Sequence, residues 1–249
     1  MTQLKSREGQ PVPKVTFRYR ENGHWKETDT DKLFKGRTVA VFSLPGAFTP
    51  TCSGTHLPRF NELAPTFKQH GVDQVICVAV NDPFVMEEWA RNQEANNVFV
   101  LPDGNSAFTG QMGMLVDMSE ENLGKRSWRY SMLVKDGTID KMFIEPDKPG
   151  DPFEVSDADT LLHYVDKDAK APDQVALLTR EGCEFCAKAK QQLKNAGVEF
   201  ADVNLPHALR TRALGAIAKA RTVPQLFVNG ELIGGGDAVE SWVKQRKQA

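Results

Sequence analysis

The chain has 249 residues, of which 40% are hydrophobic and 26% are charged, and these proportions exclude wholesale disorder. Its formal net charge of −2 gives no strong attraction to nucleic acid or membranes. Pro, Gly, Ser and Thr interrupt the longest uncharged run, residues 38–58, which excludes an ordinary transmembrane helix. The first residues lack the apolar core of a secretory signal, so we expect a cytoplasmic protein. Four cysteines are too few for a disulfide scaffold and are more typical of catalytic, metal-binding or buried positions.

Charge and composition both change between residues 166 and 173. From residue 174 onward there are 11 Lys or Arg and 7 Asp or Glu, whereas residues 1–173 hold 20 and 26. The stretch 166–173 is polar and contains Pro172, as linkers do. We therefore predict a first domain over residues 1–165, a linker over 166–173 and a second domain over 174–249.

The first domain alternates predicted strands and helices. Short apolar runs at 39–44, 75–80 and 98–101 indicate buried strands, and helical patterns follow the first two, over 57–67 and 84–92. Two further apolar runs flank the turn signal Lys135-Asp136-Gly137 and predict a hairpin. They cover residues 129–134 and 139–144, and a helical pattern at 161–165 ends the domain. This alternation predicts a sheet covered by helices.

The second domain has a similar but shorter order. We predict strands at 175–178 and 200–203, each followed by a helix, the first through Leu193 and the second over 209–220. A hairpin with an Asn229-Gly230 turn comes next, and a final helix covers 238–245. A Cys-x-x-Cys directly after the first strand makes this order typical of a thioredoxin-like domain.

The first constellation with chemical potential runs from Pro45 to Cys52. A strand ends there and a helix begins near Cys52, so its thiol faces unpaired backbone N–H groups and the positive end of the helix dipole. Both favour the thiolate, which is the nucleophile. The hydroxyl of Thr49 can donate to that sulfur or to a bound oxygen substrate. Position alone leaves open that Cys52 is a small buried hydrophobic residue.

The pattern Pro45-x-x-x-Thr49-x-x-Cys52 resembles the active-site motif of peroxiredoxins. The fuller string PGAFTPTCSGTHLPRF is similar to the five-type subfamily, and the similarity extends over most of residues 10–165. In that family an arginine from a distant strand completes the site. The matching stretch, residues 128–132, implies that this arginine is Arg129. We interpret its rival, Arg126, as a surface charge.

The resemblance implies that Cys52 attacks one peroxide oxygen and becomes a sulfenic acid. Thr49 and Arg129 would stabilise the charge that develops along the breaking O–O bond. The implied substrates are hydrogen peroxide and alkyl hydroperoxides, with no metal. We interpret Cys77, inside a predicted strand, as inert, the alternative being that it resolves Cys52. A structural role is the more frequent one for a lone histidine such as His56.

The second constellation is Cys183-Glu184-Phe185-Cys186, which follows a predicted strand and opens a helix. Cys183 would lie at the helix start as the attacking thiol, and Cys186 would lie one turn inside, more buried, as the resolving thiol. Half of a zinc site is the alternative interpretation. Such a site needs about four ligands, and no second cysteine pair or His-x-x-x-His lies nearby.

Residues 174–249 resemble a glutaredoxin, through Thr222-Val223-Pro224 and the glycine-rich run that ends at Asp237. The resemblance implies a cis Pro224 facing the cysteines and a groove for glutathione, whose negative charge suits this net positive half of the chain. Glu184 departs from the proline usual in the family and should disfavour the thiolate. The groove residues that the resemblance implies are Arg180, Arg221, Thr222, Val223, Pro224, Gly236 and Asp237.

Together the two halves resemble the bacterial proteins in which a peroxiredoxin is fused to a glutaredoxin. The resemblance implies an α/β fold of two thioredoxin-like domains, each a central mixed β-sheet flanked by helices. It implies a glutathione-dependent peroxidase, with glutathione as reducing co-substrate, no permanently bound cofactor, and a homo-oligomer, dimer or tetramer. Cys52 would pass a glutathionyl group to Cys183 across a tether that raises the effective concentration. We favour a monothiol route over one that needs Cys186. The alternatives are a reductase of disulfides and glutathionylated proteins, or a redox sensor.

Overall fold

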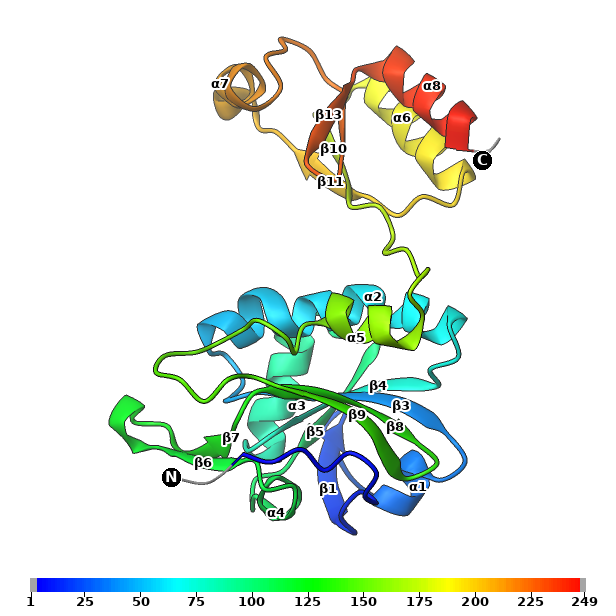
Figure 1. Cartoon of the computed structure of the whole chain (residues 1–249). Helices are drawn as coiled ribbons and strands as arrows, with labels where there is room; N and C mark the ends of the chain where they lie inside the picture. The colour runs from blue at the N-terminus through cyan, green and yellow to red at the C-terminus, as the bar shows by residue number, and fades with distance from the viewer. Residues whose placement is uncertain (1–3, 247–249) are drawn as a thin grey trace. The chain divides into compact units, whose positions relative to one another are not determined.

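The computed structural model of the chain describes residues 4–246 (Figure 1). It consists of two compact units, residues 1–171 and 172–249. Within the described residues no helix is both long and apolar enough to cross a membrane. Each unit is an α/β fold with a mixed sheet, as the sequence predicted.

The first unit is built on a five-stranded sheet with the strand order β5-β4-β3-β8-β9. β3, β4 and β5 are parallel, and β8 runs antiparallel to both β3 and β9. These are the five strands that the sequence predicted, with ends shifted by at most one residue. Their bounds are β3 Thr38–Ser43, β4 Gln74–Ala79, β5 Val98–Pro102, β8 Tyr130–Lys135 and β9 Thr138–Ile144.

Residues of β3 alternate between the two faces of this sheet and supply two separate cores. Ala40 and Phe42 face the core that α2, α3 and α5 cover. Phe42 stacks on Phe60 of α2 with 4.1 Å between ring centroids. Figure 1 shows α2 and α5 over one face of the sheet. The helices are α2 Leu57–Gln69, α3 Pro83–Asn92 and α5 Ala158–Val165.

The other face of the sheet packs against elements that the sequence analysis missed. Phe17 is buried there, together with side chains of two short helices. The hairpin that carries Phe17 is charged and mostly exposed, so it has neither an apolar run nor a clean alternation. The missed elements are β1 Thr16–Glu21, β2 His24–Asp29, α1 Thr30–Phe34, α4 Ala107–Gln111, β6 Leu115–Met118, a 3₁₀ turn Ser119–Glu121 and β7 Gly124–Ser127.

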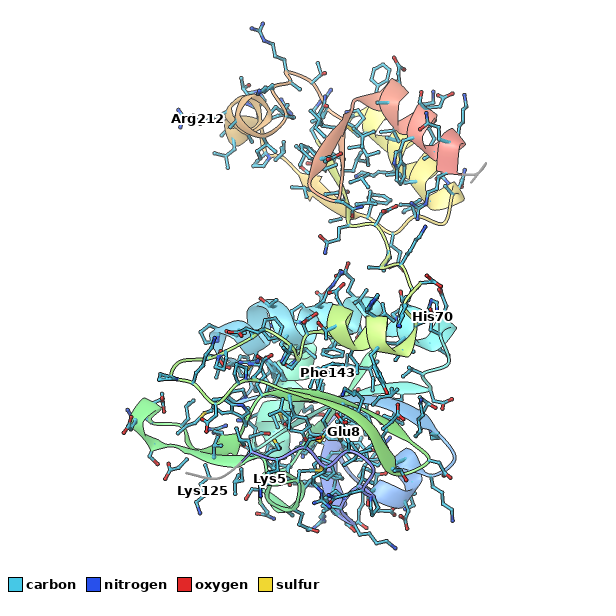
Figure 2. All side chains as sticks on the ribbon, viewed as in Figure 1. Lys5, Glu8, His70, Lys125, Phe143 and Arg212 are labelled. Carbon is cyan, nitrogen blue, oxygen red and sulfur yellow. The ribbon has the colours of Figure 1, made fainter. Side chains whose placement is uncertain are left out.

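The N-terminal segment protects the outer edge of β9. Ile139 exchanges backbone hydrogen bonds with this segment, accepting from Gly9 at 2.8 Å and donating to Gln10 at 2.9 Å. Glu8 lies beside the same strand (Figure 2) and accepts from the Met142 N–H at 2.9 Å. An edge strand covered in this way is closed to pairing with other chains.

The segment that joins the two units is anchored at both ends. Asp166 pairs with Nδ1 of His70, at the end of α2 (Figure 2), at 2.8 Å. In the second unit, Asp173 forms an ion pair with Arg246 and accepts from Asn229 Nδ2 at 2.9 Å. These contacts leave residues 167–172 as the connecting stretch.

The second unit has a four-stranded sheet with the order β11-β10-β12-β13. β10 is parallel to β11 and antiparallel to β12, which forms the predicted hairpin with β13. Figure 1 shows α6 and α8 side by side over this sheet. The elements are β10 Val175–Thr179, α6 Glu184–Asn195, β11 Ala201–Asn204, α7 His207–Ile217, β12 Gln225–Val228, β13 Glu231–Gly234 and α8 Gly236–Arg246.

Candidate active sites

The first candidate site is built around Cys52, whose side chain is completely buried. The chain leaves β3 at Ser43 and passes through a loop into a π-helical turn, Cys52–His56, which continues into α2. The sequence predicted a helix start here, and the structure begins it with this wider turn. Such turns are frequent at functional sites. Trp89 of α3 donates from Nε1 to Ser53 Oγ at 3.0 Å and so holds the turn in place.

The loop that precedes this turn is shaped by close contacts around Gly46. A Cβ atom at Gly46 would lie 3.1 Å from Arg126 Nη1 and 3.3 Å from Asn81 Oδ1, so a side chain here would displace these two neighbours by a few tenths of an ångström. Asn81 Oδ1 also accepts from the Ala47 N–H at 3.0 Å. Thr49 Oγ1 donates to the Gly46 carbonyl at 2.9 Å. This bond uses the hydroxyl proton and leaves the oxygen lone pairs of Thr49 as acceptors.

Our interpretation of Arg126 as a surface charge is wrong. Arg126 is half-buried and donates from Nε to the Leu123 carbonyl at 2.8 Å. Its Nη1 donates to the Val80 carbonyl at 3.0 Å. The guanidinium therefore ties β7 to the end of β4, beside the loop that leads to Cys52.

Arg129 brings a positive charge directly to the sulfur. Its side chain is 1% exposed, and its Nη2 donates to Cys52 Sγ at 3.6 Å. Nη2 also forms an ion pair with Asp151, and Nη1 lies 3.0 Å from His56 Nδ1. The guanidinium carbon lies 5.5 Å from the ring centroid of Phe153. This is the arginine that the sequence resemblance selected, and the structure places it against Cys52.

Strand pairing explains how Arg129 reaches the site. Arg129 directly precedes β8, whose first residue, Tyr130, pairs with Ser43 at the end of β3. The loop to Cys52 starts at the same end of β3. The guanidinium and the thiol therefore meet at the ends of the two central strands, β3 and β8. The sequence prediction placed Arg129 inside the strand, and in the structure the strand starts one residue later.

His56 is neutral and orients the guanidinium. Burial, and then the charge of Arg129, hold the pKa of His56 well below its usual value. Its Nε2 lies 3.2 Å from the Ser156 carbonyl, so Nε2 carries the proton and Nδ1 accepts from Arg129. The sequence analysis favoured a structural role for a lone histidine. A spacing of four residues from Cys52, which places side chains on one helical face, is the signal that would have revealed this contact in the sequence.

Asp151, Phe153 and Ser156 are contacts of this site that the sequence analysis missed. All three belong to residues 145–157, between β9 and α5, which have no regular secondary structure. Such a segment carries no periodic pattern that would reveal which side chains turn inward. Their proximity to Arg129 depends on tertiary packing alone.

Cys77 is buried in β4, as the sequence predicted. Burial, and then the negative charge of an ionised Cys52, raise the pKa of the Cys77 thiol well above its usual value. A thiol in this state is a poor nucleophile at neutral pH.

The second candidate site begins at Cys183, which is the N-cap of α6. Its Sγ accepts from the backbone N–H of Cys186 at 3.2 Å. Cys186 is 2% exposed against 9% for Cys183, and burial is the main cause that raises its pKa above the usual value. The predicted asymmetry between the two thiols is therefore present. Within residues 4–246, no three His, Cys, Asp or Glu side chains gather as metal ligands would.

The predicted groove residues surround these cysteines in part. The Val223–Pro224 peptide is cis, and a Cβ at Gly235 would lie 3.6 Å from the Pro224 carbonyl, so the two loops are adjacent. Arg180 lowers the pKa of Cys186 first through a backbone hydrogen bond and then through its charge, but burial outweighs both. Arg221 and Asp237 are exposed, and in the described part of the chain their side chains make no hydrogen bond or ion pair. Thr222 lies on the same loop as Pro224, and Gly236, which follows Gly235, is the first residue of α8.

Comparison with known proteins identifies both units. Residues 7–162 match the Redoxin family model, and residues 175–233 match the Glutaredoxin family model. The chain belongs to the peroxiredoxin family and carries a fused glutaredoxin domain. We refer to its two parts as the peroxiredoxin unit and the glutaredoxin unit.

Similar proteins support this assignment. The chain is 51% identical to hybrid peroxiredoxin hyPrx5 of Haemophilus influenzae, over 96% of this chain and 99% of that protein. A peroxiredoxin of Synechocystis is 51% identical over 65% of this chain and 92% of its own length. Reduced Prx3 of Vibrio vulnificus, solved in complex with H2O2, is 37% identical with a TM-score of 0.60, over 64% of this chain and 98% of that chain. The chain is thus a peroxidase-type oxidoreductase.

Removal of the Arg129 charge should slow the oxidation of Cys52. We expect Arg129→Ala to lower the second-order rate constant for oxidation by hydrogen peroxide about 100-fold, because Cys52 loses the cation that stabilises its thiolate. Stopped-flow fluorescence measures this rate. Arg126→Ala is the matched control and should have a smaller effect. A near-normal rate in Arg129→Ala with a large loss in Arg126→Ala would transfer the role to Arg126.

The neutral state of His56 predicts a pH dependence of stability. Because folding lowers the pKa of His56, the unfolded chain binds a proton more readily than the folded chain. The contribution of His56 to the free energy of unfolding should therefore be constant above about pH 6.5. At pH values below about 6.5, this contribution should destabilise the folded chain by up to about 1.4 kcal/mol for each pH unit. Urea unfolding of the wild type and of His56→Gln at several pH values measures this slope. Equal slopes in the two proteins would contradict the assignment.

Proposed function

We propose that this protein reduces hydrogen peroxide and organic hydroperoxides with glutathione as the reductant. The observation that carries the proposal is the contact between Arg129 Nη2 and the buried Cys52 Sγ, at 3.6 Å. In a chain of the peroxiredoxin family, this contact joins a thiol to a fixed cation. A related protein, Vibrio vulnificus Prx3, was solved with hydrogen peroxide bound, which supports peroxide as the substrate.

In the first step, the Cys52 thiolate attacks one oxygen of the peroxide. The O–O bond breaks, Cys52 becomes a sulfenic acid, and the other oxygen leaves as water or an alcohol after it takes up a proton. The Arg129 guanidinium stabilises the negative charge that moves from sulfur to the leaving oxygen. The Thr49 hydroxyl donates its hydrogen bond to the Gly46 carbonyl, so the lone pairs of Thr49 Oγ1 are available to accept from the peroxide O–H.

The sulfenic acid then needs a thiol from outside the peroxiredoxin unit. Cys77 is the other cysteine of this unit, and its buried position and raised pKa argue against attack on Cys52. Glutathione would condense with the sulfenic acid, releasing water and forming a Cys52–glutathione disulfide. The presence of a glutaredoxin unit in the same chain supports glutathione as this thiol.

The glutaredoxin unit would complete the cycle. The Cys183 thiolate attacks the glutathione sulfur of the mixed disulfide, and Cys52 leaves as a thiolate. A second glutathione then attacks the Cys183–glutathione disulfide and leaves with it as oxidised glutathione. The position of Cys183 at the N-terminus of α6 favours its thiolate. The exposed Arg221 and Asp237 offer one charge of each sign to a glutathione held nearby.

Cys52 is the thiol on which this cycle depends. Cys52→Ser should abolish peroxide consumption in the presence of glutathione, glutathione reductase and NADPH. Cys77→Ser, in the same unit and equally buried, is the matched control and should keep most of the activity. NADPH absorbance reports the rate. Activity of Cys52→Ser near the wild-type level would overturn the role of Cys52, whereas a wild type that consumes no peroxide would favour a dedicated disulfide reductase or deglutathionylating enzyme instead.

The two cysteines of α6 should differ in importance. Cys183→Ser should lose glutathione-dependent turnover while one equivalent of peroxide still oxidises Cys52. Cys186→Ser should keep a substantial part of the turnover, because a glutathione held by the groove presents its sulfur to Cys183 and not to the deeper Cys186. The same coupled assay measures both. If Cys186→Ser were as inactive as Cys183→Ser, a dithiol route would replace the monothiol route.

A further inference from the structure

Glu145 is a buried carboxylate that directly follows β9 and is 1% exposed. It binds four hydrogen-bond donors of one short segment. Oε2 accepts from the Glu154 N–H at 2.8 Å, and Oε1 accepts from the Val155 N–H at 2.9 Å. Oε1 also accepts from Ser156, from the backbone N–H at 2.8 Å and the hydroxyl at 2.7 Å.

No cation among the described residues balances this carboxylate. In the part of the chain that the structure describes, Glu145 makes no ion pair with Lys, Arg or His. Burial alone would raise the pKa of Glu145, but the hydrogen bonds outweigh it and lower the pKa below its usual value. An ionised carboxylate held inside a protein only by hydrogen bonds costs free energy unless every bond is in place. The segment 154–156 is therefore fixed at one position.

Glu145 is also bonded to the strand that delivers Arg129. Its backbone N–H donates to the Arg129 carbonyl at 3.1 Å. Its carbonyl accepts from Trp128 Nε1 at 2.8 Å. The backbone of Glu145 thus holds residues 128–129, while its side chain holds residues 154–156.

Residues 151–156, which end in the fixed segment 154–156, supply three contacts of the Cys52 site. Asp151 pairs with the Arg129 guanidinium, and the Ser156 carbonyl lies 3.2 Å from His56 Nε2. The Phe153 ring lies 5.0 Å from the His56 ring and also contacts the Arg129 guanidinium. Among the described residues, the partners of the Arg129 head group other than Cys52 belong to residues 151–156 or, like His56, contact them.

We propose that Glu145 is the positioning residue of the peroxidatic site. It sets the direction of the Arg129 guanidinium toward Cys52 by joining the Arg129 backbone to the segment that surrounds the Arg129 side chain. Glu145 touches neither Cys52 nor the peroxide, so it acts through Arg129 and His56. The inference rests on the proposed function in that Arg129 must act on Cys52, but it concerns geometry that exists without peroxide.

Substitution of Glu145 in the full chain tests this role. Glu145→Ala removes all four side-chain bonds, and the rate constant for oxidation of Cys52 by hydrogen peroxide should fall about 10-fold or more, because small displacements of catalytic groups cost rate steeply. Glu145→Gln keeps the oxygen that accepts three bonds and loses the one from Glu154, so its loss should be about 3-fold. The pH profile of Cys52 alkylation by iodoacetamide should shift to higher pH in the same order.

Asp103→Asn is the matched control. Asp103 is also a buried carboxylate, and it accepts from the backbone N–H groups of Phe108 at 3.1 Å and Thr109 at 2.7 Å. It lies on a different loop, without a bond to Arg129 or His56 in the described residues. Its substitution should lower the midpoint of thermal unfolding but leave the Cys52 alkylation profile and the peroxide rate within about 2-fold of the wild type.

Two outcomes would overturn the proposal. One is a folded Glu145→Ala with wild-type alkylation profile and peroxide rate. The other is an Asp103→Asn that loses as much rate as Glu145→Ala, since the loss would then reflect stability in general. If Glu145→Ala does not fold, Glu145→Gln and Ser156→Ala, which removes one bond, decide by the same two measurements, and wild-type values in both would contradict the role. Failure of the proposed function differs from these outcomes, because the wild type itself would then fail to react with peroxide while the alkylation profiles still separate the variants.

Discussion

A guanidinium that is 1% exposed imposes strict demands on everything around it. Arg129 cannot lose its proton in a protein, so each of its N–H groups needs an acceptor and its charge needs a counter-charge. Asp151 supplies a carboxylate, His56 supplies a neutral nitrogen, and Cys52 supplies the sulfur. The first two contacts leave the guanidinium incompletely satisfied, and Nε lacks a partner among the described residues. The contact with Cys52 Sγ therefore belongs to the same set of interactions that holds the arginine in its buried position.

This demand explains features that look unrelated along the chain. The π-helical turn that begins at Cys52 places His56 against the Arg129 guanidinium. The antiparallel pairing of β8 with β3 places Arg129 beside the end of β3, where the loop to Cys52 starts. The buried carboxylate of Glu145 holds residues 154–156, and Ser156 in turn contacts His56.

The glutaredoxin unit stabilises its own thiol by a different interaction. Cys183 is more exposed than Cys52 and lies at a helix N-cap, so backbone N–H groups act there in place of a buried cation.

Sequence reasoning found the elements whose patterns are local. The strands with apolar runs, the helices that follow them and the hairpin turns at 135–137 and 229–230 are present in the structure close to their predicted positions. The hairpin of β1 and β2 was missed because its strands are mostly charged and polar, and Phe17 is the one buried apolar residue in them. The motifs around Cys52 and Cys183 pointed to these two thiols through their resemblance to known active-site motifs, whereas a position near a helix start left the role of Cys52 open. Asp151, Phe153 and Glu145 could not be found in this way, since a segment without periodicity gives no sign of what it packs against.

The central claim is that Cys52 and Cys183 act in sequence, linked by one glutathionyl group. Intact-protein and peptide mass spectrometry of the wild-type chain, quenched at increasing times after one equivalent of hydrogen peroxide and excess glutathione, measures this order directly. The account predicts a sulfenic acid at Cys52 first, then a glutathione adduct at Cys52, and then an adduct at Cys183 that declines as oxidised glutathione appears. An adduct at Cys183 that forms before any at Cys52, or a Cys52 adduct that declines with none ever formed at Cys183, would contradict it.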